Sequence, residues 1–546
     1  MPIIWLLFKV LWFIIRWTWR LAFWLLKRVA RVSRTARPNG AHGTARFATF
    51  LELIWRKALS GAGPVIGKTS WDRLVRFTKD GIVMVFAATG AGKGLGVVIP
   101  TLLDYPGSIL VTDPKGENYA VTHRHRGRVG KVRMLNPTDL SRSERFNPMD
   151  MIRIGTSLET DDATALAKLM VRPDAREAHW DDKAISLLTA LILHVLHEPP
   201  ETRTLSSVRS ISVGAPETFF ETLSEISQTS RSLHAAEIAA GFLSQASTSY
   251  GDATPEFKSI LSNVHKATEQ WSAGSPAGQL AAYSTFSLDE LIDDVTTLYL
   301  CVDEELLATY ERWLRVMTGC VLNALTRGKT RPRPRHKVLL LLDEVAVLGA
   351  LEPLERQSGL LRAYCTPVLI WQNLPQVMAV YGARAAAFLA NASCRVFFGV
   401  NDNETATYVA NMLGHTTSFS QSHGTSHSSD AWLRHHEQQG ETESGYWLLD
   451  PSEVQRLPVT QLVAKFRDIP FPVRLSRIDY RNRPGWWGRW DKWRPTLVSA
   501  HLTGDRQAPD QRPQLTDPAS GTVPSDGSGR LPFPHVNQPG HSPAAR

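Results

Sequence analysis

The chain of 546 residues is longer than one hydrophobic core usually supports, so two or more domains are expected. Its formal net charge of +9 at pH 7 suits an anionic partner, such as nucleic acid or a membrane surface. Its four cysteines, Cys301, Cys320, Cys365 and Cys394, form no C-x-x-C pair, which argues against a zinc site or a disulfide framework and predicts buried, reduced thiols.

Residues 1–37 begin with an apolar, tryptophan-rich segment and end with a basic flank. Pro2–Leu26 is apolar except for three cations, which fall on one stripe of a helix that turns about 100° per residue. This pattern predicts a membrane helix, and a helix that spans the bilayer in an oligomer is expected over one that lies in the interface. The basic run over residues 27–37 would keep the following chain on the cytoplasmic side. The three cations are Lys9, Arg16 and Arg20.

A short strand followed by a glycine-rich loop is the most informative stretch of the sequence. The run Ile82–Phe86 is typical of a buried strand, and AATGAGKGLGVVIP, residues 87–100, follows it directly. Glycines let the backbone N–H groups of this loop converge on an anion, and Lys93 would reach the β and γ phosphates. A helix expected over Leu95–Leu103 would point its dipole at the same phosphates, so we predict a phosphate-binding loop. Its expected binding residues are Thr89, Gly90, Ala91, Gly92, Lys93 and Gly94.

The loop departs from the pattern G-x-x-x-x-G-K-[ST] at two positions. Ala87 stands at the first glycine position, and Gly94 stands where a hydroxyl side chain usually ligates Mg²⁺. The metal would therefore depend on water, nucleotide oxygens and an acidic residue from elsewhere in the chain. A glycine-rich turn with a chance lysine is the alternative for this stretch taken alone.

The next apolar run is a strand that continues the same fold. It lies within Ser108–Tyr119 and ends at Asp113, so strand, helix and strand form a parallel crossover unit. Asp113 and Lys115 would then lie at the carboxyl edge of the sheet beside the nucleotide, unless they belong to an ordinary polar turn.

Residues 160–286 have helical patterns with few strand-like runs, which predicts an all-α insertion before the sheet resumes at Thr297–Val302.

Two carboxylates follow the apolar run VLLLL of residues 338–342. A carboxylate at the end of such a strand must reach the Mg²⁺ shell, and its neighbour must orient and deprotonate the attacking water. We therefore assign Asp343 to the metal and Glu344 to the water. Val368–Asn373 is another buried strand, and its Gln372 is placed to contact the γ-phosphate or the water.

Three arginines are candidates for an arginine finger that acts across a subunit boundary. Arg362 follows the carboxylate-bearing strand closely and is the first choice, with Arg356 and Arg395 as rivals. An ordinary surface role is the alternative for each of them.

Five histidines lie in or beside a Ser/Thr-rich stretch, residues 416–444. Their spacing is irregular and no cysteine or carboxylate pattern accompanies them, so a mobile polar loop is expected rather than a metal site. The histidines are His415, His423, His427, His435 and His436.

These observations divide the chain into five parts. A membrane segment with its basic flank occupies residues 1–37, and the all-α insertion at 160–286 separates the two parts of a nucleotide-binding domain, 38–159 and 287–482. Residues 483–546 are rich in Pro, Gly and Ser and are expected to be a disordered tail.

Seven stretches, in this order, give the sequence a family resemblance. It resembles the type IV coupling proteins of the TraG type, the membrane-bound ATPases of conjugation and type IV secretion, over most of Gly43–Tyr480. Members of that family often have alanine and glycine where this loop has Ala87 and Gly94. The stretches are GTARFAT, AATGAGKGLGVVIPTLL, SILVTDPKGENY, LLLLDEVAVLGALEPLE, VLIWQNLPQV, CRVFFGVNDNETATYV and LLDPSEVQRLP.

The resemblance implies an α/β, RecA-like P-loop NTPase with a mainly parallel sheet, an inserted all-α domain and an N-terminal membrane helix. It also implies a homo-hexamer in the bacterial inner membrane that hydrolyses ATP with Mg²⁺, its bulk in the cytoplasm. Its partners would be type IV secretion channel components and a relaxase-bound single DNA strand or effector proteins. The alternatives are a DNA pump that works without a secretion channel and a nucleotide-binding membrane scaffold with little hydrolysis.

Overall fold

The computed structural model describes residues 43–172, 178–245, 254–327, 331–356, 361–425 and 437–493, together with Trp12 and Thr18. The predicted N-terminal membrane helix and the tail beyond Trp493 lie outside these ranges. Within the ranges, no helix has both the length and the apolar character that crossing a bilayer requires.

An eleven-stranded sheet carries the nucleotide-binding domain, in the order β2-β1-β13-β12-β9-β3-β8-β7-β4-β6-β5. Seven neighbouring strands, from β9 to β5 in that order, pair in parallel, and the four at the other end pair antiparallel. The predicted mainly parallel α/β sheet is therefore confirmed. The strands are β1 Val65–Lys68, β2 Leu74–Arg76, β3 Ile82–Ala87, β4 Ile109–Asp113, β5 Lys131–Leu135, β6 Thr296–Cys301, β7 Val338–Leu342, β8 Cys365–Trp371, β9 Ala392–Phe398, β12 Gln461–Phe466 and β13 Val473–Ser476.

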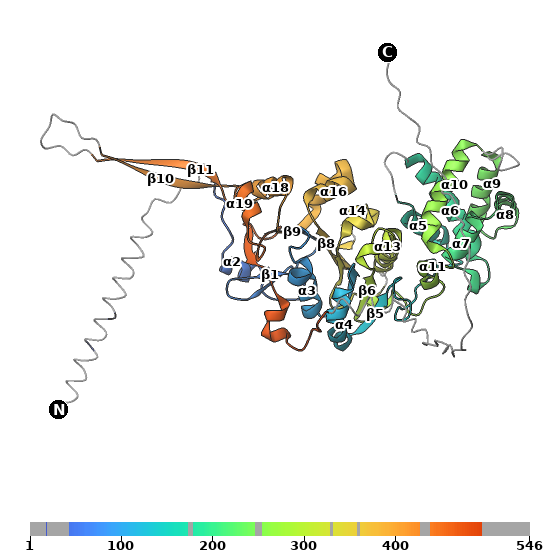
Figure 1. The fold of residues 1–546 in the computed structure, drawn as a ribbon, viewed down its shortest axis with the longest axis horizontal. Coiled ribbons are helices and arrows are strands. Elements are labelled where there is room, and N and C mark those ends of the chain that lie inside the picture. Colours follow the sequence, from blue (N-terminus) through green and yellow to red (C-terminus); the bar gives the residue numbers. More distant parts are fainter. Residues whose placement is uncertain are drawn as a thin grey trace, which may run out of the picture. The chain divides into compact units, whose positions relative to one another are not determined.

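Both faces of the central strands are buried, which explains why they read as continuous apolar runs. Along β3, Ile82, Met84 and Phe86 join one hydrophobic cluster, whereas Val83 and Val85 join the cluster on the opposite face. Helices cover the sheet, as Figure 1 shows. They include α3 Ile99–Asp104, α4 Glu117–Val129, α13 Glu311–Arg327, α14 Glu352–Arg356, α16 Leu374–Tyr381, α17 Ala385–Asn391 and α18 Asn403–Leu413, with α2 Phe50–Trp55 and α19 Pro451–Arg456 beside the antiparallel strands.

Between β5 and β6, the described ranges contain helices and no β-strand. The long α6, Ala178–Leu196, lies at the centre and contacts α5, α7, α9 and α10, which explains why leucines such as Leu187 and Leu191 are fully buried. These helices are α5 Glu159–Met170, α7 Leu205–Ser212, α8 Pro216–Thr229, α9 Leu233–Gln245, α10 Pro255–Thr268, α11 Pro276–Leu280 and α12 Glu290–Asp293.

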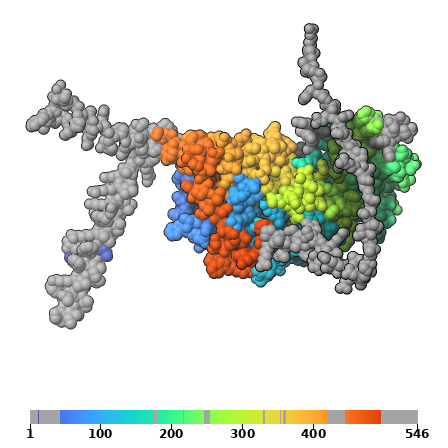
Figure 2. Space-filling model, in the orientation of Figure 1, coloured from blue at the N-terminus to red at the C-terminus, as the bar shows by residue number. Residues whose placement is uncertain are grey.

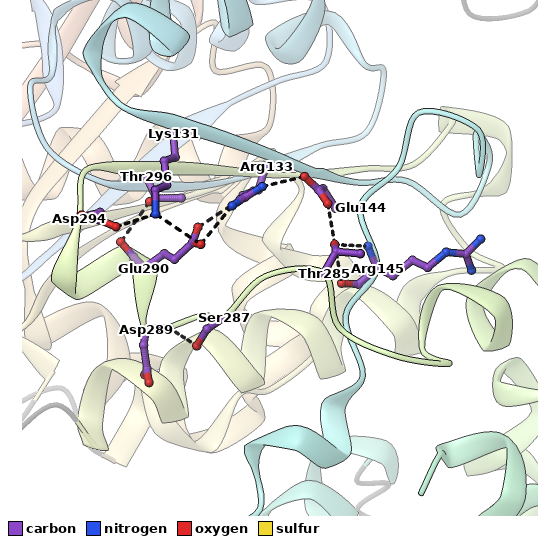
Figure 3. Close-up of polar contacts among 10 residues, drawn as sticks. All are labelled: Lys131, Arg133, Glu144, Arg145, Thr285, Ser287, Asp289, Glu290, Asp294 and Thr296. Carbon is purple, nitrogen blue, oxygen red and sulfur yellow. Dashed lines mark hydrogen bonds and ion pairs between the residues drawn. The ribbon is translucent and has the colours of Figure 1, made fainter. Parts of the chain in front are cut away.

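The chain leaves the sheet for these helices and returns from them along two paired segments (Figure 3). Thr285 N–H donates to the carbonyl oxygen of Arg145 at 2.9 Å, and Arg145 N–H donates to Thr285 Oγ1 at 3.1 Å. Arg133 on β5 forms ion pairs with Glu144 on the outgoing segment, at 2.9 Å, and with Glu290 on the returning one, at 3.0 Å. These contacts hold the two connections of the insertion side by side.

The histidine-containing stretch is a two-stranded sheet where it is described. β10, His415–Thr425, pairs antiparallel with β11, Glu437–Trp447, over its whole length. The prediction of a mobile polar loop was therefore wrong over these two strands, because they are regular secondary structure. Two polar segments that pair in this way satisfy the backbone groups that face the partner strand, and composition does not reveal such pairing.

All four cysteines are buried and unoxidised, as predicted. Burial raises the pKa of the Cys320 and Cys365 thiols to about 12, so they behave as small hydrophobic side chains.

The last described residues, Arg477–Trp493, form a segment that we call the C-terminal cap. Ile478, Tyr480 and Trp486 are buried in one cluster with Ile99 and Leu103 of α3 and with Val121 of α4. In Figure 2 this segment is the red end of the described chain. Residues 483–493, which the sequence assigned to the tail, thus belong to the packed domain.

Candidate functional site

The predicted phosphate-binding loop, Thr89–Gly94, connects the carboxyl end of β3 to a helical segment. Gly90 and Gly92 have φ angles of +79° and +82°, a conformation that side chains with a Cβ rarely adopt. Ala91 N–H donates to the carbonyl oxygen of Ala88 at 3.0 Å, and Ala91 is buried. The loop is therefore a tight turn with the glycine conformations that a convergent set of N–H groups requires.

The helix expected after the loop is present, with one local difference. A π-helical turn, Gly94–Val98, precedes α3, and the side chains of its residues Val97 and Val98 are buried. This wider first turn begins directly after Lys93, so its free N–H groups lie at the loop.

The two predicted carboxylates lie at the carboxyl end of β7 and face Lys93. Lys93 Nζ lies 3.0 Å from Asp343 Oδ1 and also forms an ion pair with Glu344. Residues about 250 positions apart in the chain are thus in direct contact, because parallel strands place their carboxyl ends at one edge of the sheet.

Gln372 joins this cluster from the strand between the other two. β8 lies between β3 and β7 in the sheet, and Gln372 follows its last residue. Its Nε2 donates to Glu344 Oε2 at 3.1 Å. Glu344 is consequently held between an ammonium and an amide, both aimed at its carboxylate.

Burial and charge act against each other in the cluster. Burial raises the pKa of Asp343, although Lys93 opposes the shift. Burial also lowers the pKa of Lys93, but the charges of Asp343 and Glu344 outweigh it, so the net shift is upward and the lysine stays charged. Glu344 itself has φ 54°, in the left-handed region, which costs on the order of 1 kcal/mol and is typical of functional sites.

Asp113 lies beside this cluster, at the end of β4, the strand next to β7. Its Oδ2 accepts from Tyr119 N–H at 2.8 Å, whereas its buried Oδ1 has no hydrogen-bond partner among the described residues. Burial raises its pKa from 3.8 to about 6. The position at the carboxyl edge that the sequence predicted for Asp113 is therefore confirmed.

Asp113→Asn is expected to stabilise the protein at pH 8 by about 1 to 3 kcal/mol, because an amide avoids the cost of burying a charge. The folded pKa is raised, so the folded state binds more protons than the unfolded state between pH 4 and 6. Stability of the unchanged protein should rise as the pH falls through 6, and the advantage of the variant should vanish near pH 4. Urea unfolding at both pH values measures this, and an advantage that persists at pH 4 would contradict it.

The arginine candidates lie elsewhere. Arg362 precedes β8, at the amino edge of the sheet, where its carbonyl oxygen accepts from Lys337, which precedes β7. It is thus at the opposite edge from Lys93 in its own subunit, and its role across a subunit boundary stays a prediction. Arg395 on β9 donates to the Tyr408 hydroxyl at 2.5 Å. The side chain of Arg356 is not among those described.

One arginine at this site has no counterpart in the sequence predictions. Arg477, at the start of the C-terminal cap, donates to the carbonyl oxygen of Ala91 in the loop. Arg477 follows β13, a short strand that β12 and β9 separate from β3 in the sheet, and only the pairing of these four strands brings the end of β13 to the loop.

The cluster fits a nucleotide with Mg²⁺. The loop offers backbone N–H groups and a charged lysine to phosphates, and Asp343 offers a carboxylate oxygen to a metal. No three His, Cys, Asp or Glu side chains gather into a metal cage within the described ranges. Mg²⁺ typically needs no such cage, because it binds one or two carboxylates together with phosphates and water.

Comparisons with known proteins show which family the chain resembles in sequence. Residues 54–492 match the family described as Type IV secretory system Conjugative DNA transfer. The chain is 32% identical over 347 residues to the probable conjugal transfer protein TraG of Sinorhizobium fredii, covering 61% of this chain and 52% of TraG. It is 30% identical over 460 residues to VirD4 of Agrobacterium fabrum, covering 81% of this chain and 66% of VirD4.

Solved structures give the same fold. The unbound conjugative coupling protein TrwB superposes with a TM-score of 0.59 at 16% identity, over 80% of this chain and 93% of that one. TrwB has also been solved with the non-hydrolysable ATP analogue ADPNP and with ADP and Mg²⁺. The chain spans about half the length of the TraG proteins that it matches. The family match over residues 54–492 places this chain in the type IV secretory system conjugative DNA transfer family.

Proposed function

We propose that the chain is a membrane-anchored, hexameric ATPase that delivers a relaxase-bound DNA strand, effector proteins or both to a type IV secretion channel. The observation that carries the proposal is the convergence of Lys93, Asp343, Glu344 and Gln372 at one edge of the sheet. A lysine, a metal-binding carboxylate, a base and a polar residue next to the base are the parts that phosphoryl transfer to water requires.

Each residue has a distinct chemical role in this proposal. Lys93 would bind the β and γ phosphates, which would compete with the Glu344 carboxylate for the Lys93 ammonium group. Asp343 would ligate Mg²⁺, and Glu344 would orient the attacking water and accept its proton, with Gln372 holding the Glu344 carboxylate in place. When bound, Mg²⁺ neutralises charge on the phosphates.

The relatives support the nucleotide and the cargo. TrwB binds an ATP analogue, and ADP with Mg²⁺, on the same fold. TraG is a conjugal transfer protein by name, and the family is one of conjugative DNA transfer. The proposal also includes hexamer formation, the inner-membrane location, Arg362 as the arginine finger and the partnership with channel components.

ATP turnover by the purified full-length chain, measured with and without single-stranded DNA, tests the motor. Turnover that DNA stimulates is expected. Gly94, which lacks the metal-binding hydroxyl, favours the alternative of a nucleotide-binding scaffold, and that alternative predicts no turnover.

Deleting the gene from cells that carry a type IV channel should stop transfer, and unchanged transfer would contradict the coupling role.

Gly94→Ser is expected to lower the Mg²⁺ concentration for half-maximal turnover on the order of tenfold, the scale of ligand changes at metal sites. A Cβ on Gly94 would meet no described atom within 4 Å, so the added hydroxyl has room. A Mg²⁺ titration of turnover measures the shift. Gly127→Ser, at an equally open position on α4, is the matched control. An unchanged Mg²⁺ requirement in Gly94→Ser would contradict a metal beside this residue.

A further inference from the structure

Arg477 lies directly against the phosphate-binding loop. Its Nη1 donates to the carbonyl oxygen of Ala91. A Cβ on Gly92 would overlap the guanidinium, and a Cβ on Gly96 would lie 2.5 Å from Arg477 Cγ. The guanidinium therefore covers Gly92, and the aliphatic part of the side chain covers the first helical turn.

Strand directions explain why Arg477 reaches this edge. β13 is antiparallel to β12, β12 is antiparallel to β9, and β9 is parallel to β3. β13 therefore runs in the same direction as β3, and the residue after it emerges at the same edge as the loop. Arg477 N–H donates to the carbonyl oxygen of Thr460 at 2.7 Å, which fixes its backbone beside β12.

The residues after Arg477 hold it in place from the other side. Ile478, Tyr480 and Trp486 are buried against α3 and α4, and Asp491 forms an ion pair with Arg124 of α4 at 2.8 Å. Arg477 thus extends from a backbone that is fixed both by a strand and by a packed segment. The backbone at such a position loses no further conformational freedom when the side chain forms a hydrogen bond, so only the rotamer freedom of the arginine is lost.

We propose that Arg477 is a positioning residue that holds the phosphate-binding loop in its anion-binding shape. The peptide group is planar and trans, so the Ala91 carbonyl and the Gly92 N–H point in opposite directions. A donor that fixes the carbonyl on the outside of the loop therefore directs the Gly92 N–H inward, next to Lys93. The positive charge of the guanidinium also lies close behind the loop, where it favours an anion.

This inference rests on the proposed nucleotide binding, and it assigns a role to the glycine at position 92 as well. Gly92 needs its positive φ, and it must also leave room for the guanidinium. The competing interpretation is that Arg477 only attaches the C-terminal cap to the domain. In that case its loss would lower stability without changing nucleotide affinity.

Nucleotide affinity of the folded full-length chain separates the two interpretations. We expect Arg477→Gln to raise the Kd for a fluorescent ADP analogue on the order of tenfold, the scale of one charge-assisted hydrogen bond. The KM for ATP should rise to a similar extent while kcat changes by less than about twofold. Arg477→Lys keeps a charged donor and should recover part of the affinity.

Arg474→Gln is the matched control, because Arg474 lies on β13, the strand that Arg477 follows, and donates to Gln461 Oε1 rather than to the loop. It should bind the analogue as tightly as the unchanged protein. A Kd for Arg477→Gln within twofold of the unchanged protein would overturn the inference, with the proposed function intact. If Arg477→Gln does not fold, the Kd of Arg477→Lys decides the question. A raised Kd supports the inference, and a Kd within twofold of the unchanged protein overturns it. Failure of the unchanged protein to bind the analogue would overturn the proposed function together with this inference.

Discussion

Replacing Glu344 by glutamine is expected to reduce ATP turnover by a factor of about 10² to 10⁴, the usual contribution of a general base. Glutamine has the same shape as glutamate, and its side-chain oxygen can still accept the hydrogen bond from Gln372. It carries no charge and cannot take a proton from water. Nucleotide affinity should be kept or increased, because the variant side chain no longer competes with phosphates for Lys93.

Phosphate release and nucleotide binding, measured on the same preparation, check this expectation. In cells, the proposed substrate transfer should stop, whereas the amount of the variant in the membrane fraction should equal that of the unchanged protein. Glu404→Gln, an exposed position on α18, is the matched control and should leave turnover unchanged. Turnover in Glu344→Gln within about threefold of the unchanged protein would remove Glu344 from its assigned role, because a general base contributes far more than that.

Replacing Lys93 by alanine is expected to lower nucleotide affinity at least about a hundredfold and to abolish turnover and the proposed transfer. The amount of the variant in the membrane fraction should again equal that of the unchanged protein. The change removes the charge that would bind the phosphates. It also leaves buried Asp343 next to Glu344 without the cation that both carboxylates now contact. Losing one partner of a buried ion pair typically costs about 3 to 5 kcal/mol of stability.

The stability of Lys93→Ala should depend on pH. Burial already raises the pKa of Asp343, and losing Lys93 would raise it further. The folded variant would then bind more protons than its unfolded state, so its stability should increase as the pH falls from 8 to 5. Urea unfolding at both values measures this effect. Lys168→Ala, at an exposed position on α5, is the control, and a stability loss in Lys93→Ala that is equal at pH 5 and pH 8 would contradict the assigned ion pair.

Local features of the site followed directly from the sequence. The glycines at 90 and 92 adopt the positive φ angles that the loop pattern requires, and the apolar runs before Ala87 and Asp343 are strands. Strand ends carry polar residues to the carboxyl edge of a parallel sheet, so the approximate location of Asp113 and Gln372 was also predictable. These features depend on a few neighbouring residues and on the steric limits of the backbone.

Two features depended on how segments of the chain pair or pack against one another. The stretch after Gly414 is polar enough to suggest a loop, yet β10 and β11 pair over their full lengths. Residues 483–493 are rich in Trp, Gly and Arg and were assigned from their composition to the disordered tail, yet Trp486 is buried against α3 and α4. Composition describes which groups a segment carries, whereas pairing and burial depend on what the rest of the chain brings to it.

The sequence by itself determined the parts of the site: a loop with Lys93, a strand that ends in Asp343 and Glu344, another that ends in Gln372, and a helical region between them. Only the tertiary structure decided which of these parts touch. It placed β8 between β3 and β7, so that Gln372 reaches Glu344, and it put Arg362 at the opposite edge of the sheet. It also turned β13 to run with β3, which brings Arg477 to the loop. The physical reason is that strand order and direction are set by long-range hydrogen bonding and burial, which no local pattern encodes.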